Sequence, residues 1–457
     1  MKKPLANFLS ISALITMAFI ANASIAQSNF VPGQLLVQFR ANVSDDDEHH
    51  ALSKYQGEIL ERIKSHAMHL EGRGNLIVAR FLPDRALNKI IQSLNAHPAI
   101  EYAEPNWIYK HQAISNDTYY INGSLWGMYG DDATPPSNTF GIRADETWEA
   151  GCTGSDNVYV GIIDEGIQFM HPDLRNNIWT NGFDPEDGID NDGNGKIDDI
   201  HGWDFSANNK SIYDGGLLGK ADQHGTHVAG TIGATGGNGI GVAGVNWNVT
   251  MISGKFLGAN GGTTANAIKA IDYFTDLKLR HGLNIVATNN SWGGGGFSRA
   301  LLDAINRGGD AGILFVAAAG NGGLDGRGDN NDTRANYPSN YECTSNGKDY
   351  DCVIAVAALN RDGTLASFSN FGARTVDVAA PGSGIWSTIP VNKYATFSGT
   401  SMATPHVTGA VALYASINSG ATPAEIKAAI LENTIPTPSL AGKTVTGGRL
   451  NVEAFCR

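Results

Sequence analysis

Charged residues and cysteines are both scarce in this sequence of 457 residues. Asp, Glu, Lys and Arg make up 17% of the chain and hydrophobic residues 42%, which excludes a highly charged disordered protein and allows a sizeable core. Basic residues are the scarcer charge, because 32 Lys and Arg stand against 45 Asp and Glu and give a net charge of −13. That balance argues against a nucleic-acid-binding protein.

Long hydrophobic runs are nearly absent as well. The one that stands out, residues 8–21, follows Lys2 and Lys3 and precedes small residues that end at Ala26. This layout predicts a cleaved secretory signal over residues 1–26, and hence an extracellular or periplasmic protein with no membrane segment after cleavage. The alternative is an N-terminal membrane anchor, but the run is shorter than the ~20 residues that span a bilayer.

The four cysteines form an even set, which favours disulfides in an exported protein. Cys343 and Cys352 flank a polar stretch and are the natural local pair. That assignment leaves Cys152 to pair with Cys456. Four zinc ligands are the alternative, but the sequence has no CxxC motif and no clustered histidines.

The chain is long enough for more than one domain. Residues 27–112 are expected to form a small α+β unit, followed by a polar join. Residues 113–457 carry most of the negative charge, with twenty carboxylates between positions 117 and 222. In the small unit we expect strands over 35–39 and 76–81 and helices over 45–63 and 84–95.

From about residue 155, short apolar runs rich in β-branched residues alternate with helical segments. The expected strands are 158–163, 251–257, 284–288, 313–319, 353–359 and 376–379, and the expected helices are 265–279, 299–308, 403–417 and 423–431. This alternation predicts an α/β fold with a mostly parallel sheet and helices on both faces. Ligands then belong at the carboxyl ends of the strands.

Three residues at expected strand ends and helix starts suggest nucleophilic catalysis. Asp164 ends a strand, His224 begins a helix and Ser401 stands just before another helix. Asp, His and Ser in this order match one known order of a catalytic triad, whereas a lone Asp at a strand end is more often a turn former. His224 would take the proton of Ser401, and Asp164 would hold the other ring nitrogen protonated. Asn321, after the strand 313–319, offers a side-chain donor for the oxyanion.

Four segments around these residues resemble the signature blocks of the subtilases, the subtilisin-like serine proteases. They are 164–167 (DEGI), 224–230 (HGTHVAG), 318–321 (AAGN) and 399–403 (GTSMA). The resemblance covers residues 113–457, and residues 28–112 resemble the inhibitory propeptide of that family. It implies a subtilisin-like fold and a secreted, monomeric serine endopeptidase that acts through an acyl-enzyme and is made as a self-processing zymogen.

The resemblance also implies residue roles. Asp164 orients, His224 is base and then acid, Ser401 is the nucleophile and Asn321 the oxyanion donor, whereas His227 and His406 match structural positions. Two segments, 255–263 and 290–294, resemble those that pair with an extended polypeptide substrate. The implied substrate-binding residues are Gly261, Gly262, Thr263, Ser291, Trp292, Gly293, Ala319 and Gly320.

The sequence departs from the family pattern in places that affect specificity. Glu165 stands where Ser or Thr is more usual, and Asp222 stands where a neutral residue is common. Both acids either favour basic groups near the scissile bond or are solvated surface residues. Residues 322–336 replace part of the segment that forms the wall of the family's primary specificity pocket. The sequence therefore does not show which substrate side chain is preferred.

Two segments suggest structural Ca²⁺. The first offers oxygens at alternating positions around a glycine turn, from Asp190, Asp192, Asn194, Asp198 and Asp199. His201 at its twelfth position excludes an EF-hand, and a solvated acidic loop is the alternative. The second site is implied by the resemblance alone, with ligands Asp117, Asp173, Gly236, Asn238, Ile240 and Val242.

Three other functions are weaker interpretations. Residues 239–244 match the GxGxxG dinucleotide pattern, but a helix precedes them and a strand follows, which is the reverse of the required order. An α/β-hydrolase esterase needs G-x-S-x-G, and residues 399–403 lack the second glycine. A catalytically inactive binding protein on the same fold would have lost a triad member, and all three are present.

Overall fold

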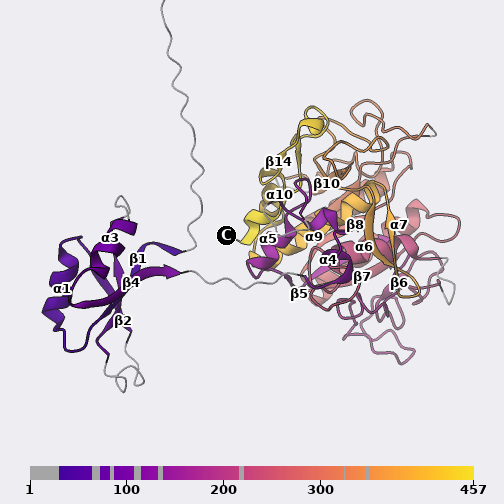
Figure 1. Cartoon of the computed structure of the whole chain (residues 1–457). Coiled ribbons are helices and arrows are strands. Elements are labelled where there is room, and N and C mark those ends of the chain that lie inside the picture. Colours follow the sequence, from indigo (N-terminus) through magenta and orange to yellow (C-terminus); the bar gives the residue numbers. More distant parts are fainter. Residues whose placement is uncertain are drawn as a thin grey trace, which may run out of the picture. The chain divides into compact units, whose positions relative to one another are not determined.

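The computed structural model describes residues 30–63, 73–82, 87–107, 115–131, 137–215, 221–323, 325–344 and 350–456. The chain divides into two compact units, Met1–Tyr109 and Lys110–Arg457 (Figure 1). The predicted signal segment, residues 1–26, lies outside the described residues. The cleavage positions implied by boundaries after residues 26 and 112 stay predictions.

The first unit is a small α+β domain, as expected. In its described residues, four strands form an antiparallel sheet in the order β2-β3-β1-β4, and two helices pack on it. The strands are β1 (Phe30–Phe39), β2 (Glu58–Ile63), β3 (Leu76–Arg80) and β4 (Ile100–Trp107), and the helices are α1 (Asp45–Ser53) and α3 (Leu87–Asn95). Leu35 and Val37 of β1, Leu52 of α1 and Leu94 of α3 are fully buried in one core.

One secondary-structure prediction in this unit is wrong. The helix expected over 45–63 ends at Ser53, and its second half is strand β2. Gln56 adopts a positive φ of 55°, which a continuing helix does not allow. Ile59 and Ile63 then pair with Ala79 and Leu76 of β3, so strand pairing outweighs the local helical pattern.

The second unit has the predicted α/β architecture. Nine of its described strands form one sheet in the order β14-β15-β11-β10-β9-β8-β5-β7-β6, and all neighbours pair in parallel except β14 with β15. The strands are β5 (Gly154–Asp164), β6 (Gly202–Asp204), β7 (Asn248–Lys255), β8 (Ile285–Asn290), β9 (Leu314–Ala318), β10 (Val353–Leu359), β11 (Val378–Pro381), β14 (Ile435–Pro436) and β15 (Gly448–Arg449). A separate hairpin joins β12 (Ile385–Ile389) to β13 (Lys393–Phe397).

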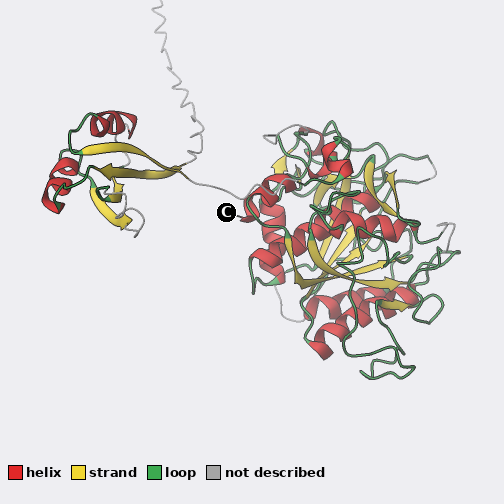
Figure 2. Ribbon diagram, turned by 60° about the horizontal axis from the view of Figure 1, so that its bottom comes forward, coloured by secondary structure: helices red, strands yellow, loops and turns green. Residues whose placement is uncertain are grey.

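Helices cover both faces of this sheet (Figure 2). The helices are α4 (Thr118–Ile121), α5 (Ala144–Glu149), α6 (Gln223–Gly233), α7 (Thr264–His281), α8 (Arg299–Asp310), α9 (Thr400–Ile417) and α10 (Pro423–Glu432). Ile162 of β5 packs in one core with residues of α6 and α9, and the next residue, Ile163, packs in the other core with residues of α7 and α8. Successive side chains of a strand point to opposite faces, so β5 contributes to both cores.

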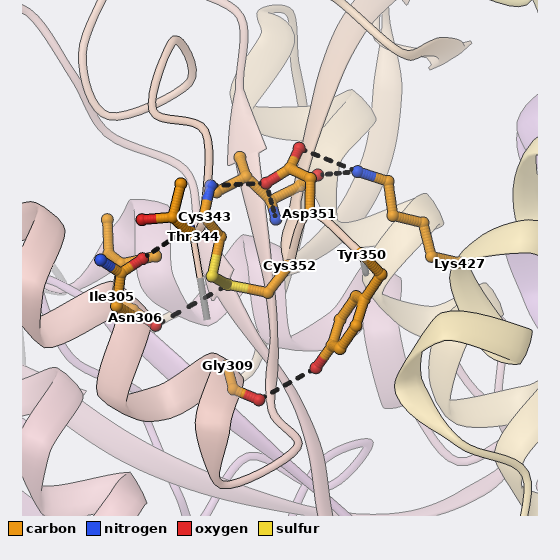
Figure 3. The surroundings of a disulfide bond; sticks show 10 residues. Ile305, Asn306, Gly309, Cys343, Thr344, Tyr350, Asp351, Cys352 and Lys427 are labelled. Carbon is orange, nitrogen blue, oxygen red and sulfur yellow. Dashed lines mark hydrogen bonds and ion pairs between the residues drawn. A yellow bond between two sulfur atoms is a disulfide. The ribbon is translucent and has the colours of Figure 1, made fainter. Parts of the chain in front are cut away.

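The structure contains the two expected disulfides. Cys152 bonds to Cys456 and Cys343 to Cys352, and no described cysteine is free. The alternative of four zinc ligands is therefore excluded. Beside the second disulfide, Asp351 accepts the backbone N–H of Cys343 at 2.7 Å and pairs with Lys427 of α10 at 3.0 Å (Figure 3). This loop is thus joined to both α8, which contacts the disulfide, and α10.

Within the described residues, no helix has the length and apolar character needed to cross a membrane. The topology instead concentrates polar residues at one edge of the sheet. Asp164 ends β5, Lys255 ends β7, and Asn290 and Asn321 stand at and just beyond the ends of β8 and β9. These strands are parallel, so their carboxyl ends meet at the same edge.

Candidate active site

Asp164 and His224 form the centre of the site. The carboxylate of Asp164 is 1% exposed and accepts a hydrogen bond from Nδ1 of His224, with N–O distances of 2.9 Å and 3.0 Å to its two oxygens. His224 is the second residue of α6, and α6 packs against β5. The proton on Nδ1 leaves Nε2 as the acceptor of the neutral ring. His224 is therefore oriented to receive a proton at Nε2.

The environment of His224 favours its charged form. Burial opposes charging, but attraction to Asp164, the hydrogen bond to Asp164 and the nearby Glu165 outweigh it, so the pKa of His224 is raised. A proton taken up at Nε2 is thus stabilised by an oriented carboxylate. This property suits a general base that later returns its proton.

Ser401 lies in the first turn of α9, one residue after the helix begins at Thr400. Its Oγ donates to the backbone oxygen of Ser291 at 3.1 Å, and Oγ of Ser291 donates to the backbone oxygen of Ser401 at 2.8 Å. In the described part of the chain, the Ser401 hydroxyl has no hydrogen bond to His224. The Ser401 hydroxyl is thus engaged by the backbone oxygen of Ser291 in this structure.

Asn321 is held with its amide nitrogen available. Its Oδ1 accepts both the backbone N–H of Thr400, at 2.8 Å, and the hydroxyl of Thr400, at 2.9 Å. These two donors fix which end of the amide is oxygen. The exposed Nδ2 end is free to donate to a ligand next to the N-terminus of α9, where the N–H groups of the first turn lack helical partners.

A groove of about 380 Å³ borders the two segments expected to pair with a polypeptide substrate, 255–263 and 290–294. Five of the eight expected substrate-binding residues line it, namely Gly261, Gly262, Thr263, Trp292 and Gly293. Three other lining residues, Phe256, Leu257 and Gly294, lie within the segments 255–263 and 290–294 that are expected to pair with a substrate. The remaining lining residues were not predicted from the sequence, and they are Thr264, Ala267, Gly295, Gly296, Leu301 and Tyr337. The run of four glycines was a usable signal, but Tyr337 reaches the groove from a distant loop.

The other three expected substrate-binding residues lie elsewhere. Ser291 is buried and bonds to Ser401. Ala319 is fully buried, and its N–H donates to Val356. The N–H of Gly320 donates to Oγ1 of Thr400 at 3.2 Å. Ser291 and Gly320 therefore support the first turn of α9, Ala319 bonds to β10, and none of the three lines the groove.

Comparison with known proteins agrees with this geometry. The subtilase family (Peptidase_S8) matches residues 155–452, and the N-terminal prodomain of fervidolysin matches residues 18–106, a range that overlaps the predicted signal segment. The chain belongs to the subtilase family. It is a subtilisin-like serine protease with an N-terminal prodomain.

Individual relatives of this subtilase are proteases as well. It is 33% identical to a thermophilic serine proteinase of Bacillus sp. (strain AK1), over 94% of this chain and 88% of the relative. It is 35% identical to thermitase of Thermoactinomyces vulgaris, over 68% of this chain and 91% of thermitase. A solved structure described as proteases from Pseudoalteromonas arctica PAMC 21717 is 30% identical, with a TM-score of 0.55, and covers 75% of this chain and 98% of that one.

Two further histidines of this subtilase have structural surroundings. His227 is fully buried and its Nε2 lies 2.9 Å from the backbone oxygen of Ile385, while Nδ1 of His406 lies 2.9 Å from the backbone oxygen of Met402. Burial lowers the pKa of His227 to about 3 and that of His406 to about 4. Both rings are neutral at physiological pH, which fits the non-catalytic role expected of them.

Five of the six ligands expected for the second calcium site are linked by hydrogen bonds, namely Asp117, Asp173, Asn238, Ile240 and Val242. Asp117 is fully buried and accepts the backbone N–H groups of Gly237, Asn238 and Gly239, at 2.8–3.1 Å. Asp173 is fully buried too and accepts Nδ2 of Asn238 at 2.7 Å and the N–H of Val242 at 2.9 Å. Burial raises the pKa of Asp173 to about 6. In the described residues, both carboxylates bond to neutral donors only, so the residues fit a cation.

The acidic loop expected to form the first calcium site is largely occupied by internal donors. Asp190 accepts the N–H groups of Asn194 and Gly195, and Asp198 accepts Nζ of Lys210 at 2.9 Å. Asp192 lies 3.0 Å from Nε2 of His281. Asp199 accepts the hydroxyl of Tyr273 at 2.6 Å, and burial raises its pKa to about 6. Among the described residues, no group of three or more His, Cys, Asp or Glu has the arrangement of a metal site.

Proposed function

We propose that this protein is a secreted, monomeric serine endopeptidase that cleaves peptide bonds in polypeptides through an acyl-enzyme. The observation that carries the proposal is the orientation of His224. Asp164 holds its Nδ1 at 2.9 Å, so Nε2 is the acceptor, and we expect the Ser401 hydroxyl to exchange the backbone oxygen of Ser291 for this acceptor. Export is supported by the layout of residues 1–26 and by the two disulfides.

The reaction then follows from the positions of these groups. His224 takes the proton of Ser401 as Oγ attacks the carbonyl carbon of the peptide. The negative charge on the carbonyl oxygen is stabilised by the N–H of Ser401 and by Nδ2 of Asn321. The C–N bond breaks, and the imidazolium returns its proton to the leaving amine. Water then attacks the acyl-enzyme with His224 again acting as base, and the imidazolium returns its proton to Oγ of Ser401. The carboxylic acid product is thereby released from Ser401.

The groove beside this site is suited to an extended polypeptide. The backbone groups of the two glycine-rich segments, Gly261–Gly262 and Gly293–Gly296, border it and offer strand-type pairing to a substrate main chain. Phe256, Trp292 and Tyr337 add aromatic rings to a lining that is otherwise largely glycine backbone. We therefore expect a large apolar side chain of the substrate to bind here.

A serine-directed phosphonylating reagent tests the proposed chemistry. The proposal predicts one covalent adduct, located on Ser401 by mass spectrometry, together with loss of casein hydrolysis in proportion to labelling. Hydrolysis of a p-nitrophenyl ester should be lost in parallel. An adduct on another serine, or casein cleavage that persists after complete labelling of Ser401, would exclude the proposed nucleophile.

The prodomain is proposed to act as an intramolecular inhibitor that the protease removes itself. Residues 27–112 form this segment, and cleavage is expected between 112 and 117, where a polar join follows the last strand of the domain. N-terminal sequencing of the secreted protein tests this. Active enzyme should begin near residue 113, and a Ser401→Ala variant should keep the prodomain. Fully active protein that begins near Gln27 would contradict it.

Structural Ca²⁺ is part of the proposal. Asp117 and Asp173 would hold it together with oxygens of the loop 236–242, because two buried carboxylates without a cationic partner are otherwise costly. The ion would stabilise the fold and take no part in peptide hydrolysis. The loop 190–199 is proposed as a further calcium site. Its carboxylates would have to give up hydrogen bonds to donors within the loop in order to bind the ion.

A further inference from the structure

The start of helix α6 has no side-chain cap of its own. Its N-cap residue, Asp222, adopts a left-handed conformation with φ 61° and makes no capping hydrogen bond. The carboxylate of Asp222 instead pairs with Lys255 at the end of β7 and accepts the backbone N–H of Asp214. The first N–H groups of α6 therefore need an acceptor from another element.

Glu165 supplies that acceptor. Its Oε1 lies 2.6 Å from the backbone nitrogen of His224, and the residue comes directly after Asp164 at the end of β5. The backbone N–H of Glu165 in turn donates to Oδ1 of Asp164 at 2.8 Å. Two consecutive residues of one strand end thus hold His224 at two points, Asp164 at the ring and Glu165 at the main chain.

We propose that Glu165 is a positioning residue for catalysis, which fixes the first turn of α6 and so the imidazole of His224. The inference rests on the proposed role of His224 as the base. A main-chain hydrogen bond to the residue that carries the ring limits how far that ring moves relative to Ser401. A short bond between a carboxylate and an N–H at a helix N-terminus is also among the stronger ones.

The charge of Glu165 acts on the same histidine. The titratable groups that face Glu165 are Asp164 at the end of β5, His224 on α6 and Asp222 just before α6. The negative charge of Glu165 contributes to raising the pKa of His224. Burial raises the pKa of Glu165 itself, while the hydrogen bond from His224 lowers it.

This arrangement differs from the two interpretations drawn from the sequence. Glu165 is not a fully solvated surface acid, because it is partly buried and bonded to α6. Selection of basic substrates would require the carboxylate to act on the substrate, whereas positioning requires it to act on His224. The two roles predict different kinetic constants to change, since selection affects KM for basic substrates and positioning affects kcat for all of them.

Two variants of the processed enzyme separate the hydrogen bond from the charge. Glu165→Ala removes both, and we expect kcat to fall by about tenfold while KM stays within about twofold. Glu165→Gln keeps an acceptor oxygen but removes the charge, so most of kcat should remain. Loss of the charge lowers the pKa of His224. Because His224 must be neutral to act as base, the acid limb of the pH–rate profile should then move to lower pH.

The measurement uses one peptide substrate with neutral residues near the scissile bond and one with a basic residue there. Glu342→Gln, which changes an exposed carboxylate, is the matched control and should leave kcat and the pH profile unchanged. Unchanged kcat and pH profile in both Glu165 variants would overturn the positioning role. A change confined to KM for the basic substrate would overturn it as well and assign selection instead. If His224→Ala is itself active, the proposed catalytic mechanism fails, and this outcome is distinct from a failure at Glu165 alone.

Discussion

Asp222 and Lys255 form an ion pair, 2.5 Å between Oδ1 and Nζ, in which both side chains are almost inaccessible to solvent. Asp214, which is half-exposed, adds a second carboxylate 2.7 Å from the same Nζ. Asp222 is the residue before α6, and Lys255 is the residue of β7 that pairs with Asp164. The helix that carries His224 is thus tied to the sheet edge that carries Asp164.

Lys255→Met should strongly destabilise the second unit, because it leaves the buried Asp222 without its cation. Removal of one partner of a buried pair costs about 3–5 kcal/mol. Urea unfolding in a Ser401→Ala background, which prevents autolysis, measures the change. The double variant Asp222→Asn, Lys255→Met should recover part of the loss, and Lys210→Met, which removes a lysine whose own side chain is 44% exposed, should cost less than Lys255→Met. Equal losses of stability in Lys255→Met and Lys210→Met would contradict the stabilising role of the buried Asp222–Lys255 pair.

Asp164→Asn should reduce kcat by about 10⁴-fold, because the amide no longer holds the proton on Nδ1 of His224. The remaining activity should also show a shifted pH profile. The carboxylate raises the pKa of His224, so its removal lowers that pKa and moves the acid limb to lower pH. The profile is measured as kcat/KM on a neutral peptide substrate. An acid limb that moves to higher pH would contradict the electrostatic role of Asp164.

Chelation of calcium should destabilise the protein more at pH 8 than at pH 5. The folded-state pKa of Asp173 is raised to about 6, so the protonated form is favoured in the folded protein. Without the ion, the contribution of Asp173 to the free energy of unfolding is therefore greatest below its unfolded-state pKa of 3.8. That contribution is lost as the pH rises through about 6. An ion at a hundredfold excess over Kd contributes about 2.7 kcal/mol.

Thermal inactivation with and without EDTA at the two pH values measures this effect. Asp173→Asn should reduce the difference, and the initial rate directly after chelation should be unchanged. An equal thermal lifetime with and without EDTA would contradict structural calcium. Immediate loss of activity in a folded enzyme would indicate a catalytic metal and contradict the serine mechanism.

The disulfides should stabilise the fold in different degrees. Cys343 and Cys352 are nine residues apart, which predicts about 2–3 kcal/mol from loop closure, whereas Cys152 and Cys456 are 304 apart and should contribute more. Unfolding of the two double Cys→Ala variants in urea tests the order. Free thiols in the native secreted enzyme would contradict both bonds.

The central strands and the long helices were predictable from the sequence, and local features were less so. Strands such as β10, buried on both faces, appear as uninterrupted apolar runs, and α7 and α10 have clear caps at Thr263 and Thr422. Strand β2 was not predictable, because Glu58–Ile63 has the local pattern of a helix and becomes a strand only by pairing with β3.

The candidate site divides in the same way. Asp164, His224, Asn321 and Ser401 stand in long local motifs, so the sequence alone was enough to select them. The hydrogen bond from His224 to Glu165 joins residues 59 positions apart, so no local pattern encodes it. The place of Tyr337 in the groove depends on the course of a loop, which the sequence does not show either. The same holds for the absence, among the described residues, of a Ser401–His224 hydrogen bond, because the Ser401 hydroxyl donates to the backbone oxygen of Ser291, which lies 110 positions away.

Peptide hydrolysis by Ser401→Ala tests the central claim most directly. The control is Ser416→Ala in the same helix, where the hydroxyl donates only to the backbone oxygen of Leu413. Turnover of a peptide amide should fall by about 10⁶-fold in Ser401→Ala, the loss known for the triad serine of subtilisin in the same family, and should be unchanged in the control. Near-normal turnover by purified, correctly folded Ser401→Ala protein, with its prodomain removed by a second protease, would contradict the account.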